Sequence, residues 1–164
     1  PLKGIPIFPL NPATASYRPG LRGSTLRTPA GDLGITICNE NMYPGLSRDA
    51  TRSGAEILVN LSNDAWWPKR FYLANHFVFN IFRAVENRRA AVVASNVGIS
   101  ALIDDRGRIL KQAPVFKPWT LTGTIIKSRR LTFYSRHGDI FALTAIVIPL
   151  IAVILSFLSK RRRR

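Results

Sequence analysis

The stretch GITICNEN, residues 34–41, contains the single cysteine of this 164-residue chain. Ile35 and Ile37 flank Thr36 in the alternating pattern of a β-strand, and the polar residues that follow have the chemistry of a turn and a helix start. Cys38 is therefore predicted to stand where a strand ends. In α/β proteins such positions often carry reactive groups, because the strand is rigid and the loop after it is open to substrate.

Two interpretations of Cys38 are open from the residue alone. A lone cysteine beside isoleucines is most often a small buried hydrophobic residue. A nucleophilic cysteine needs a neighbouring base, cation or helix N-terminus to favour its thiolate. Glu40 is close enough in sequence to contribute to such chemistry, or it is an ordinary carboxylate at a helix start.

Composition suits one globular domain with a core and an additional apolar element, since 46% of the residues are hydrophobic and 20% are charged. A single cysteine excludes an internal disulfide and argues against a Cys-based zinc site, so neither a metal nor a cofactor is expected. The net charge is +15, and residues 160–164 contribute five of the positive charges. The remainder is still basic enough to favour anionic partners such as phospholipid head groups. The chain begins at Pro1, and we expect it to be a piece of a longer protein.

The pattern of residues predicts an α/β layered domain. Frequent Pro and Gly make the first thirty residues an irregular surface segment. After it, apolar runs and periodicities predict a strand at 33–37, a helix from Pro44 to about 53–54, a strand at 55–61, a helix at 71–89, strands at 90–95 and 99–103, a turn at 104–108, and strands at 109–113 and 119–126.

The predicted helix at 71–89 has apolar residues at spacings of three and four, with charged residues expected on its other side and in its last turn. The apolar set is Phe71, Leu73, Ala74, Phe77, Val78, Ile81, Phe82 and Val85, and the charged set is Arg83, Glu86, Arg88 and Arg89. His76 is interpreted as a packed or surface histidine rather than a metal ligand, because no second His or Cys lies at ligand spacing. Glu86 is interpreted as an exposed carboxylate that solvates the helix near Arg83 and Arg89.

Two adjacent tryptophans, Trp66 and Trp67, follow the strand at 55–61 in a loop that ends at Pro68. Leaving both indoles in water is costly, so they either pack beneath the loop, or line a pocket or contact lipid.

Residues 140–159 carry no charge and are numerous enough to span a hydrocarbon core as one helix. Pro149 would kink that helix, which membrane helices tolerate. The basic residues 160–164 then predict a cytoplasmic tail, and residues 1–138 are placed on the periplasmic side. Four basic residues on the N-terminal side of residues 140–159 are expected to attract anionic lipid: Lys127, Arg129, Arg130 and Arg136.

Five ordered blocks of the chain together resemble the carbon-nitrogen hydrolase (nitrilase) superfamily. They are Ile37 to Glu40, Leu58 to Trp66, Arg83 to Arg88, Ser95 to Ser100, and Asp105 to Gly107. Within the superfamily, the blocks and the apolar tail are most similar to the bacterial apolipoprotein N-acyltransferases. The resemblance covers roughly residues 30 to 130.

The resemblance implies a four-layer αββα sandwich, of which this chain holds a part, and a Glu, Lys, Cys triad. Cys38 matches the nucleophile, and Glu40 matches an acidic residue found two positions later in the acyltransferases. Asn39 stands where some members have Tyr, and its backbone N–H is a candidate oxyanion donor. No block before Cys38 matches the triad's Glu and Lys. Lys3 lies in the stretch PLKG, which resembles the segment that follows the motif of the catalytic lysine. We therefore expect the chain to be inactive alone.

The implied reaction moves a fatty acyl chain from a phospholipid, through a Cys38 thioester, to the N-terminal amine of a diacylglyceryl-cysteine lipoprotein. Both substrates are membrane-bound, and Trp66 and Trp67 are candidates for contacting acyl chains. Two alternatives are a membrane-tethered amidase that hydrolyses small amides by the same thioester route, and a basic binding protein. Nucleic acid is not expected as a partner, because the basic residues are dispersed and no nucleic-acid motif accompanies them.

Overall fold

A single mixed sheet organises the computed structural model, which describes residues 21, 23–66 and 70–162. Its six strands follow each other in space in chain order, β1 to β6. The strands are β1 (Leu26–Thr28), β2 (Gly31–Ile37), β3 (Ile57–Ser62), β4 (Ala90–Ser95), β5 (Ala101–Ile103) and β6 (Ile109–Gln112). The helices are η1 (Cys38–Met42), α1 (Pro44–Arg52), η2 (Asp64–Trp66), α2 (Arg70–Asn87), α3 (Phe133–His137) and α4 (Ile140–Arg162).

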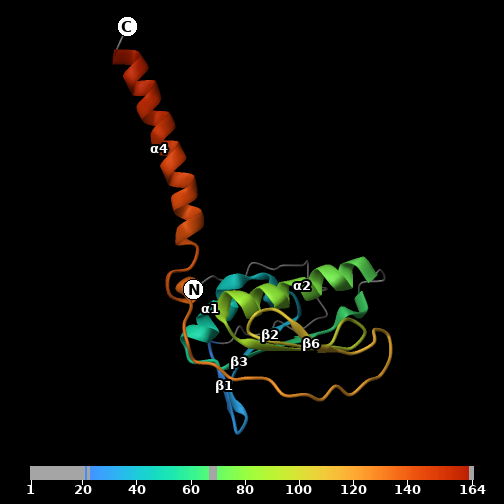
Figure 1. The fold of residues 1–164 in the computed structure, drawn as a ribbon. Coiled ribbons are helices and arrows are strands. Elements are labelled where there is room, and N and C mark those ends of the chain that lie inside the picture. The colour runs from blue at the N-terminus through green and yellow to red at the C-terminus, as the bar shows by residue number, and fades with distance from the viewer. Residues whose placement is uncertain (1–20, 22, 67–69, 163–164) are drawn as a thin grey trace.

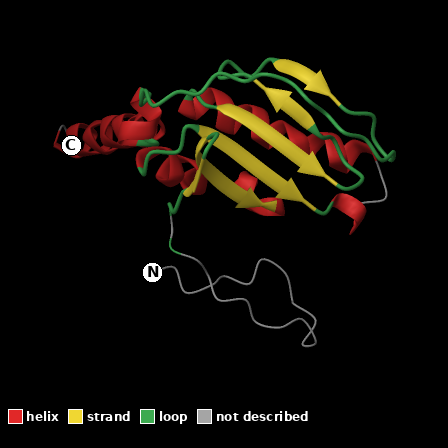
Figure 2. Ribbon diagram, turned by 90° about the horizontal axis from the view of Figure 1, so that it is seen from below, coloured by secondary structure: helices red, strands yellow, loops and turns green. Residues whose placement is uncertain are grey.

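The centre of the sheet is parallel. Strands β2, β3 and β4 run in the same direction, and β1, β5 and β6 are antiparallel to their neighbours. Helices α1 and α2 are the crossover connections of the parallel strands, and both lie on one face of the sheet (Figure 2). This arrangement brings the ends of β2, β3 and β4, and the loops that follow them, to the same edge.

The core lies between the sheet and the two helices. Its buried residues are Leu58, Phe77, Ala84, Ala91, Val93, Ala101 and Ile103. Gly34 of β2 faces the same layer, where a Cβ would lie about 3 Å from side-chain atoms of Ala50, Ala55 and Leu58. The absence of a side chain at Gly34 therefore lets α1 approach the strand closely.

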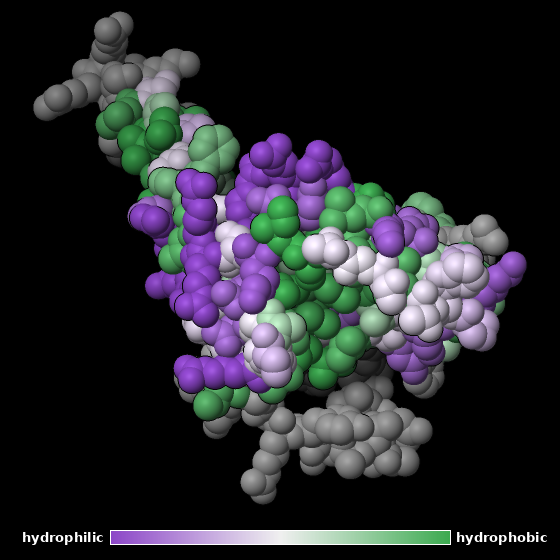
Figure 3. All heavy atoms as spheres, turned by 60° about the horizontal axis from the view of Figure 1, so that its bottom comes forward, coloured by the Kyte–Doolittle hydropathy of each residue, from purple (hydrophilic) through white to green (hydrophobic). Residues whose placement is uncertain are grey.

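The other face of the sheet remains partly open. Because side chains alternate along a strand, the residues next to the core positions point to this face. Ile37 is 63% exposed and Leu61 is 45% exposed. Figure 3 looks onto this side of the molecule and shows apolar side chains gathered over its centre.

Most of the predicted elements are confirmed. The strands at 33–37, 55–61 and 90–95 correspond to β2, β3 and β4, and the two predicted helices correspond to α1 and α2. The predicted turn at 104–108 joins β5 to β6, with a hydrogen bond from Asp104 N to Arg108 O and a positive φ of 82° at Gly107.

Two predictions about extended segments are wrong. The segment before β2 is not irregular throughout, because Leu26–Thr28 pairs with Gly31–Leu33 as an antiparallel hairpin. Residues 119–126 do not form a strand. They belong to an extended arm, residues 113–132, that runs along the sheet and is held by side-chain contacts such as Lys111 Nζ to Thr122 O at 2.7 Å.

The predicted faces of α2 are also partly wrong. Phe71, Val78, Phe82 and Val85 are exposed. The buried side instead includes His76, Asn80, Arg83 and Asn87, and Arg89 just after the helix is fully buried. Glu86 is half-buried rather than exposed, and it accepts a hydrogen bond from Arg83 at 2.8 Å.

Arg89 is buried because its guanidinium satisfies several backbone carbonyls. Nε donates to Ala55 O at 2.6 Å, and Nη1 donates to Arg130 O at 2.7 Å and to Asn87 O at 3.2 Å. Burial lowers the pKa of this guanidinium. Arg89 thus ties the end of the arm to the base of β3 and β4.

Helix α4 projects away from the sheet and its covering helices (Figure 1). Every side chain that the structure describes in it, from Ile140 to Ser156, is exposed. Within the described part of the chain, no helix meets the length and hydropathy that a membrane crossing requires. The described residues form one sheet with one helical layer of an α/β fold.

Candidate functional site

Cys38 is the first residue of η1, at the sharp turn directly after β2. Its φ is +52°, in the left-handed region that costs a residue with a side chain about 1–2 kcal/mol. Such strain between a strand and a helix is the geometry that presents a nucleophile above the end of a sheet. The thiol is half-buried and unpaired with any other cysteine.

Neighbouring elements hold this turn in place. Asn60 of β3 donates through Nδ2 to Cys38 O at 3.2 Å and to Thr36 O at 3.3 Å. Asn41 is fully buried. Its side-chain Nδ2 donates to His76 O at 3.2 Å, and its backbone carbonyl accepts from Arg83 Nη1 at 3.4 Å. The backbone around Cys38 is therefore fixed to both β3 and α2.

Glu40 binds the backbone rather than the thiol. The N–H of Ile37 donates to Glu40 Oε2 at 2.8 Å, the contact that a carboxylate in the first turn of a helix makes with the residue before that helix. Asn39 follows Cys38 in η1 and is half-buried. The first N–H groups of a helix have no acceptor within it, so the Asn39 N–H is suitably placed for an oxyanion donor.

Asp64, at the start of η2, is 3% exposed and accepts several hydrogen bonds. Oδ1 accepts from Ser62 Oγ at 2.5 Å and lies 2.9 Å from His76 Nδ1, and Oδ2 accepts from Ser95 Oγ at 2.7 Å. Burial would raise the pKa of Asp64, but the hydrogen bonds from His76, Ser62 and Ser95 outweigh it and lower the pKa. The carboxylate is thus held in its ionised form.

His76 is 8% exposed and faces Asp64. Burial would lower its pKa, but the hydrogen bond and charge of Asp64 outweigh burial and raise the pKa, and the Cys38 backbone acts in the same direction. Among the described residues, the second ring nitrogen, Nε2, has no hydrogen-bond partner.

The cluster Cys38, Asp64 and His76 forms where η1, η2 and α2 meet. One ligand-type atom from each residue lies within 4.8 Å of the others. The prediction that His76 is a packed or surface histidine left both environments open. The structure buries His76 and places it beside Asp64 and Cys38, neighbours that the prediction did not include. The signal available in the sequence was the row His76, Asn80 and Arg83, whose spacing of three and four places polar groups on one helical face.

These residue types can also bind a metal ion. The hydrogen bonds at Asp64 argue against that use, because both carboxylate oxygens accept from hydroxyls and one also faces His76. Within the described part of the chain, this leaves Cys38 Sγ and His76 Nε2 as the available ligand atoms of the cluster, fewer than the three protein ligands of a catalytic zinc site.

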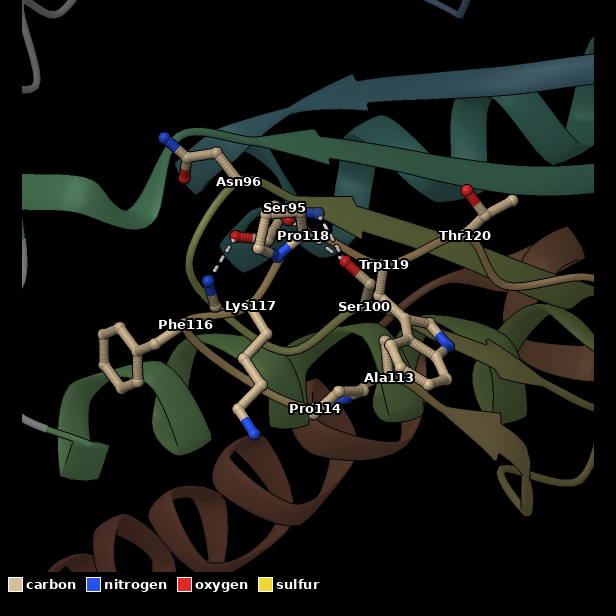
Figure 4. Close-up of a pocket in the computed structure, with 11 residues that line it drawn as sticks. Ser95, Asn96, Ser100, Ala113, Pro114, Phe116, Lys117, Pro118, Trp119 and Thr120 are labelled. Atoms are coloured by element: carbon tan, nitrogen blue, oxygen red, sulfur yellow. Dashed lines mark hydrogen bonds between the residues drawn. The ribbon is translucent and has the colours of Figure 1, made fainter.

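A cavity of about 520 Å³ lies beside this cluster, between the loop after β4 and the arm. Ser95, Asn96 and Ser100 line its polar side, and Phe116, Lys117 and Trp119 lie along the arm (Figure 4).

Gly98 forms the boundary between this cavity and Asp64. Its N–H donates to Ser95 Oγ at 2.9 Å, and a Cβ at this position would overlap the Asp64 carboxylate. Ser95 belongs to both environments, because it lines the cavity and donates to Asp64.

The predicted role of Trp66 and Trp67 falls on side chains that the structure does not describe. Trp66 ends η2, two residues after Asp64, and its side chain lies outside the description. Trp67 lies outside the described residues altogether.

Comparison with known proteins places these features in context. The carbon-nitrogen hydrolase family model matches residues 9–131. The apolipoprotein N-acyltransferase of Geobacter metallireducens is 38% identical over 88% of this chain, and that of Thermotoga maritima is 35% identical over 92%. The chain spans only 28% and 30% of the length of these relatives.

A solved structure has a similar fold. The carbon-nitrogen hydrolase from Helicobacter pylori G27 superposes with a TM-score of 0.53 and 21% identity, over 59% of this chain and 41% of that one. At this identity the similarity concerns the fold alone.

Proposed function

Because the chain belongs to the carbon-nitrogen hydrolase family, we propose that it is the part of an N-acyltransferase that carries the nucleophile, Cys38. The observation that carries this proposal is the position of Cys38 at a left-handed turn directly after β2. A structural cysteine gains nothing from such a strained backbone, whereas a nucleophile gains exposure and a fixed direction of attack. The similarity to apolipoprotein N-acyltransferases supplies the acyl-transfer chemistry.

The reaction proceeds in two steps. The Cys38 thiolate attacks the carbonyl carbon of a phospholipid ester, the carbon–oxygen bond breaks, and the lysophospholipid leaves with a proton. The N-terminal amine of a diacylglyceryl-cysteine lipoprotein then attacks the thioester, loses a proton and forms an amide, and the thiolate is released. The Asn39 N–H stabilises the oxyanion of each tetrahedral intermediate.

The remaining catalytic groups come from outside this chain. The Glu that takes and returns the proton and the Lys that supports the oxyanion belong, by the resemblance, to an upstream segment. Glu40 contributes by fixing the backbone of Ile37, directly before the nucleophile. The chain by itself is then inactive.

We place the enzyme in the bacterial inner membrane, with residues 1–138 on the periplasmic side and α4 as its anchor. The support is the row of exposed apolar side chains on α4, including Ile146, Ile148 and Ile151, followed by the basic residues 160–164. Apolar side chains exposed along the length of a helix require an apolar environment. Residues 139–159 are the proposed span, which extends past Ser156, the last residue of α4 whose side chain is described, and residues 160–164 are the proposed cytoplasmic tail.

The test is a transfer assay with the full-length protein in detergent, a phospholipid and a synthetic diacylglyceryl lipopeptide. We expect the lipopeptide to gain the mass of one acyl chain, and we expect Cys38→Ser to abolish that gain. Glu40→Gln keeps an oxygen acceptor for Ile37 and is expected to retain part of the activity.

The same assay separates the amidase alternative. Hydrolysis of small amides without any acylated lipopeptide would mean that the thioester is used for amide hydrolysis, and it would overturn the acyltransferase proposal.

A further inference from the structure

The buried pair Asp64–His76 lies beside the nucleophile, yet the mechanism above does not use it. Asp64, His76 and Cys38 each place one ligand-type atom within 4.8 Å of the others. Asp64 and His76 are 3% and 8% exposed. Burying two ionisable groups is costly unless they are paired and hydrogen-bonded, so their place at the site calls for a role.

Asp64 acts as an anchor. It accepts hydrogen bonds from Ser62 and Ser95, and its own backbone N–H donates to Asn96 Oδ1 at 3.0 Å. With its oxygens occupied in this way, Asp64 is poorly placed to take a proton from Cys38 and well placed to orient His76. A carboxylate that binds Nδ1 fixes the ring and favours its protonated form.

His76 is held from both ends. Its backbone carbonyl accepts from Asn41, in the same short helix as Cys38, and its Nδ1 faces Asp64. Its Nε2 is buried and has no hydrogen-bond partner among the described residues. The imidazole lies in the same cluster as the Cys38 thiol, and the Cys38 backbone adds to the raised pKa of His76.

We propose that His76, anchored by Asp64, is a positioning residue that places a protonated imidazole beside Cys38 and favours its thiolate. The cation keeps its proton throughout the reaction and takes no part in bond making. It stabilises the thiolate before attack and again when the thiolate leaves the thioester. This inference rests on the proposed role of Cys38 as nucleophile, but its test reads the thiol directly.

The groups that face His76 define what a pH experiment would measure. Asp64 approaches from η2 and Cys38 from η1. Arg83 lies on the same helix, but its guanidinium is directed to Asn41 O and Glu86. Asp64 is therefore the ionised partner of His76 within the part of the chain that is described.

The experiment follows the rate at which iodoacetamide alkylates Cys38 in the full-length protein, read by peptide mass spectrometry across a range of pH. His76→Gln removes the charge and keeps a hydrogen-bond donor, Asp64→Asn removes the anchor's charge, and Ser62→Ala weakens the anchor mildly. His137→Gln, an exposed histidine on α3, is the matched control.

A cation within about 4–6 Å lowers the pKa of an acidic group by 1–3 units. We therefore expect alkylation near neutral pH to slow about tenfold in His76→Gln and Asp64→Asn and less in Ser62→Ala, with no change in His137→Gln.

Three outcomes would overturn the proposal. One is a rate in all three variants that matches the His137→Gln control. Another is slowing by the same factor at every pH, which would indicate altered access to the thiol instead of lost charge. The third is faster alkylation of the unaltered protein after a chelator is added, which would assign the cluster to a metal ion. Loss of acyl transfer with an unchanged alkylation profile would count against the proposed function but not against this role for His76.

Discussion

The two faces of the sheet differ in which side chains they bury. The face beneath α1 and α2 buries apolar residues and also Asp64, His76, Arg83 and Arg89, each with hydrogen-bonded partners. The opposite face leaves apolar residues such as Leu61 accessible. Buried polar groups with satisfied hydrogen bonds hold the side chains of a site in fixed positions. An accessible apolar face is instead suited to packing against another apolar surface.

This difference bears on the four-layer αββα sandwich implied by the family resemblance. The helical face is complete, with a closed core and an organised nucleophile. The open face has the apolar character of a surface that packs against a second sheet. The sandwich that the resemblance implies would place a second sheet against this face.

The largest expected effect is at the nucleophile. Cys38→Ala should lower acyl transfer by at least about a thousandfold, because no other group can form the thioester. The free energy of unfolding should change by less than about 1 kcal/mol, since alanine keeps the same left-handed backbone. Transfer assays and denaturant titrations of the full-length protein measure the two quantities. Retention of activity would remove Cys38 from the mechanism.

On the helical face, Arg89→Met should reduce the free energy of unfolding by about 3 kcal/mol. The substitution leaves the carbonyls of Ala55 and Arg130 without their donor, and each buried unsatisfied group costs about 1–3 kcal/mol. Denaturant unfolding measures the loss. Arg88→Met, at the exposed neighbouring position, is the matched control and should change stability by less than about 0.5 kcal/mol. Equal effects at the two positions would contradict the role of Arg89.

On the open face, Leu61→Lys tests whether a second sheet covers this side of the molecule. If a second sheet packs there in the full-length protein, a buried lysine should destabilise it by about 2 kcal/mol or more. Leu110→Lys is the matched control, because Leu110 lies on β6 and is also 45% exposed. Equal and small effects of the two substitutions on thermal unfolding would mean that the face is uncovered.

Gly98→Ala perturbs the site without removing a functional group. The added Cβ would overlap the Asp64 carboxylate, so the loop after β4 or the carboxylate must shift. We expect a loss of about 1–2 kcal/mol in stability, within the range for overpacking, and slower acyl transfer. Activity equal to that of the unaltered protein would show that the position of Asp64 is not critical.

The smallest expected effect is the pH dependence of the Asp64–His76 pair. The folded-state pKa of His76 is raised, so its stabilisation is present below the unfolded value of about 6.5 and is lost as the pH rises through the folded value. The folded-state pKa of Asp64 is lowered, so its stabilisation is present above about 3.9 and is lost as the pH falls through the folded value.

The stability difference between the unaltered protein and His76→Gln should therefore be largest between about pH 4 and 6.5 and shrink on either side. Unfolding midpoints measured over this range test it, with His137→Gln as control. A difference that is constant from acid to alkaline pH would mean that the pair is not ionised.

Local sequence patterns predicted most of the fold. The apolar runs of β2, β3 and β4 and the periodicity of α1 and α2 are properties of neighbouring residues, which is why they could be recognised. The three-residue strand β1 was missed because its pairing with β2 depends on a hairpin and not on its own composition. Residues 119–126 were predicted as a strand because their composition favours extension, but a strand also needs a ladder partner.

The site was predicted in part for the same reason. Cys38 could be selected from its place at the end of a strand and from the blocks around it. Its neighbours Asp64 and His76 are distant from it in sequence. Asp64 follows β3, which pairs in parallel with β2, and His76 lies on α2, the helix that connects β3 to β4. The buried arginines were assigned to the surface because their carbonyl partners come from other elements, which helical periodicity cannot reveal.

The most direct test of the central claim is the intact mass of the full-length protein in detergent with phospholipid, before and after hydroxylamine, with Cys38→Ala alongside. The account predicts a mass increase of one acyl chain that hydroxylamine removes and that the variant lacks. The absence of any hydroxylamine-sensitive adduct in the unaltered protein, with phospholipid present, would contradict a thioester at Cys38.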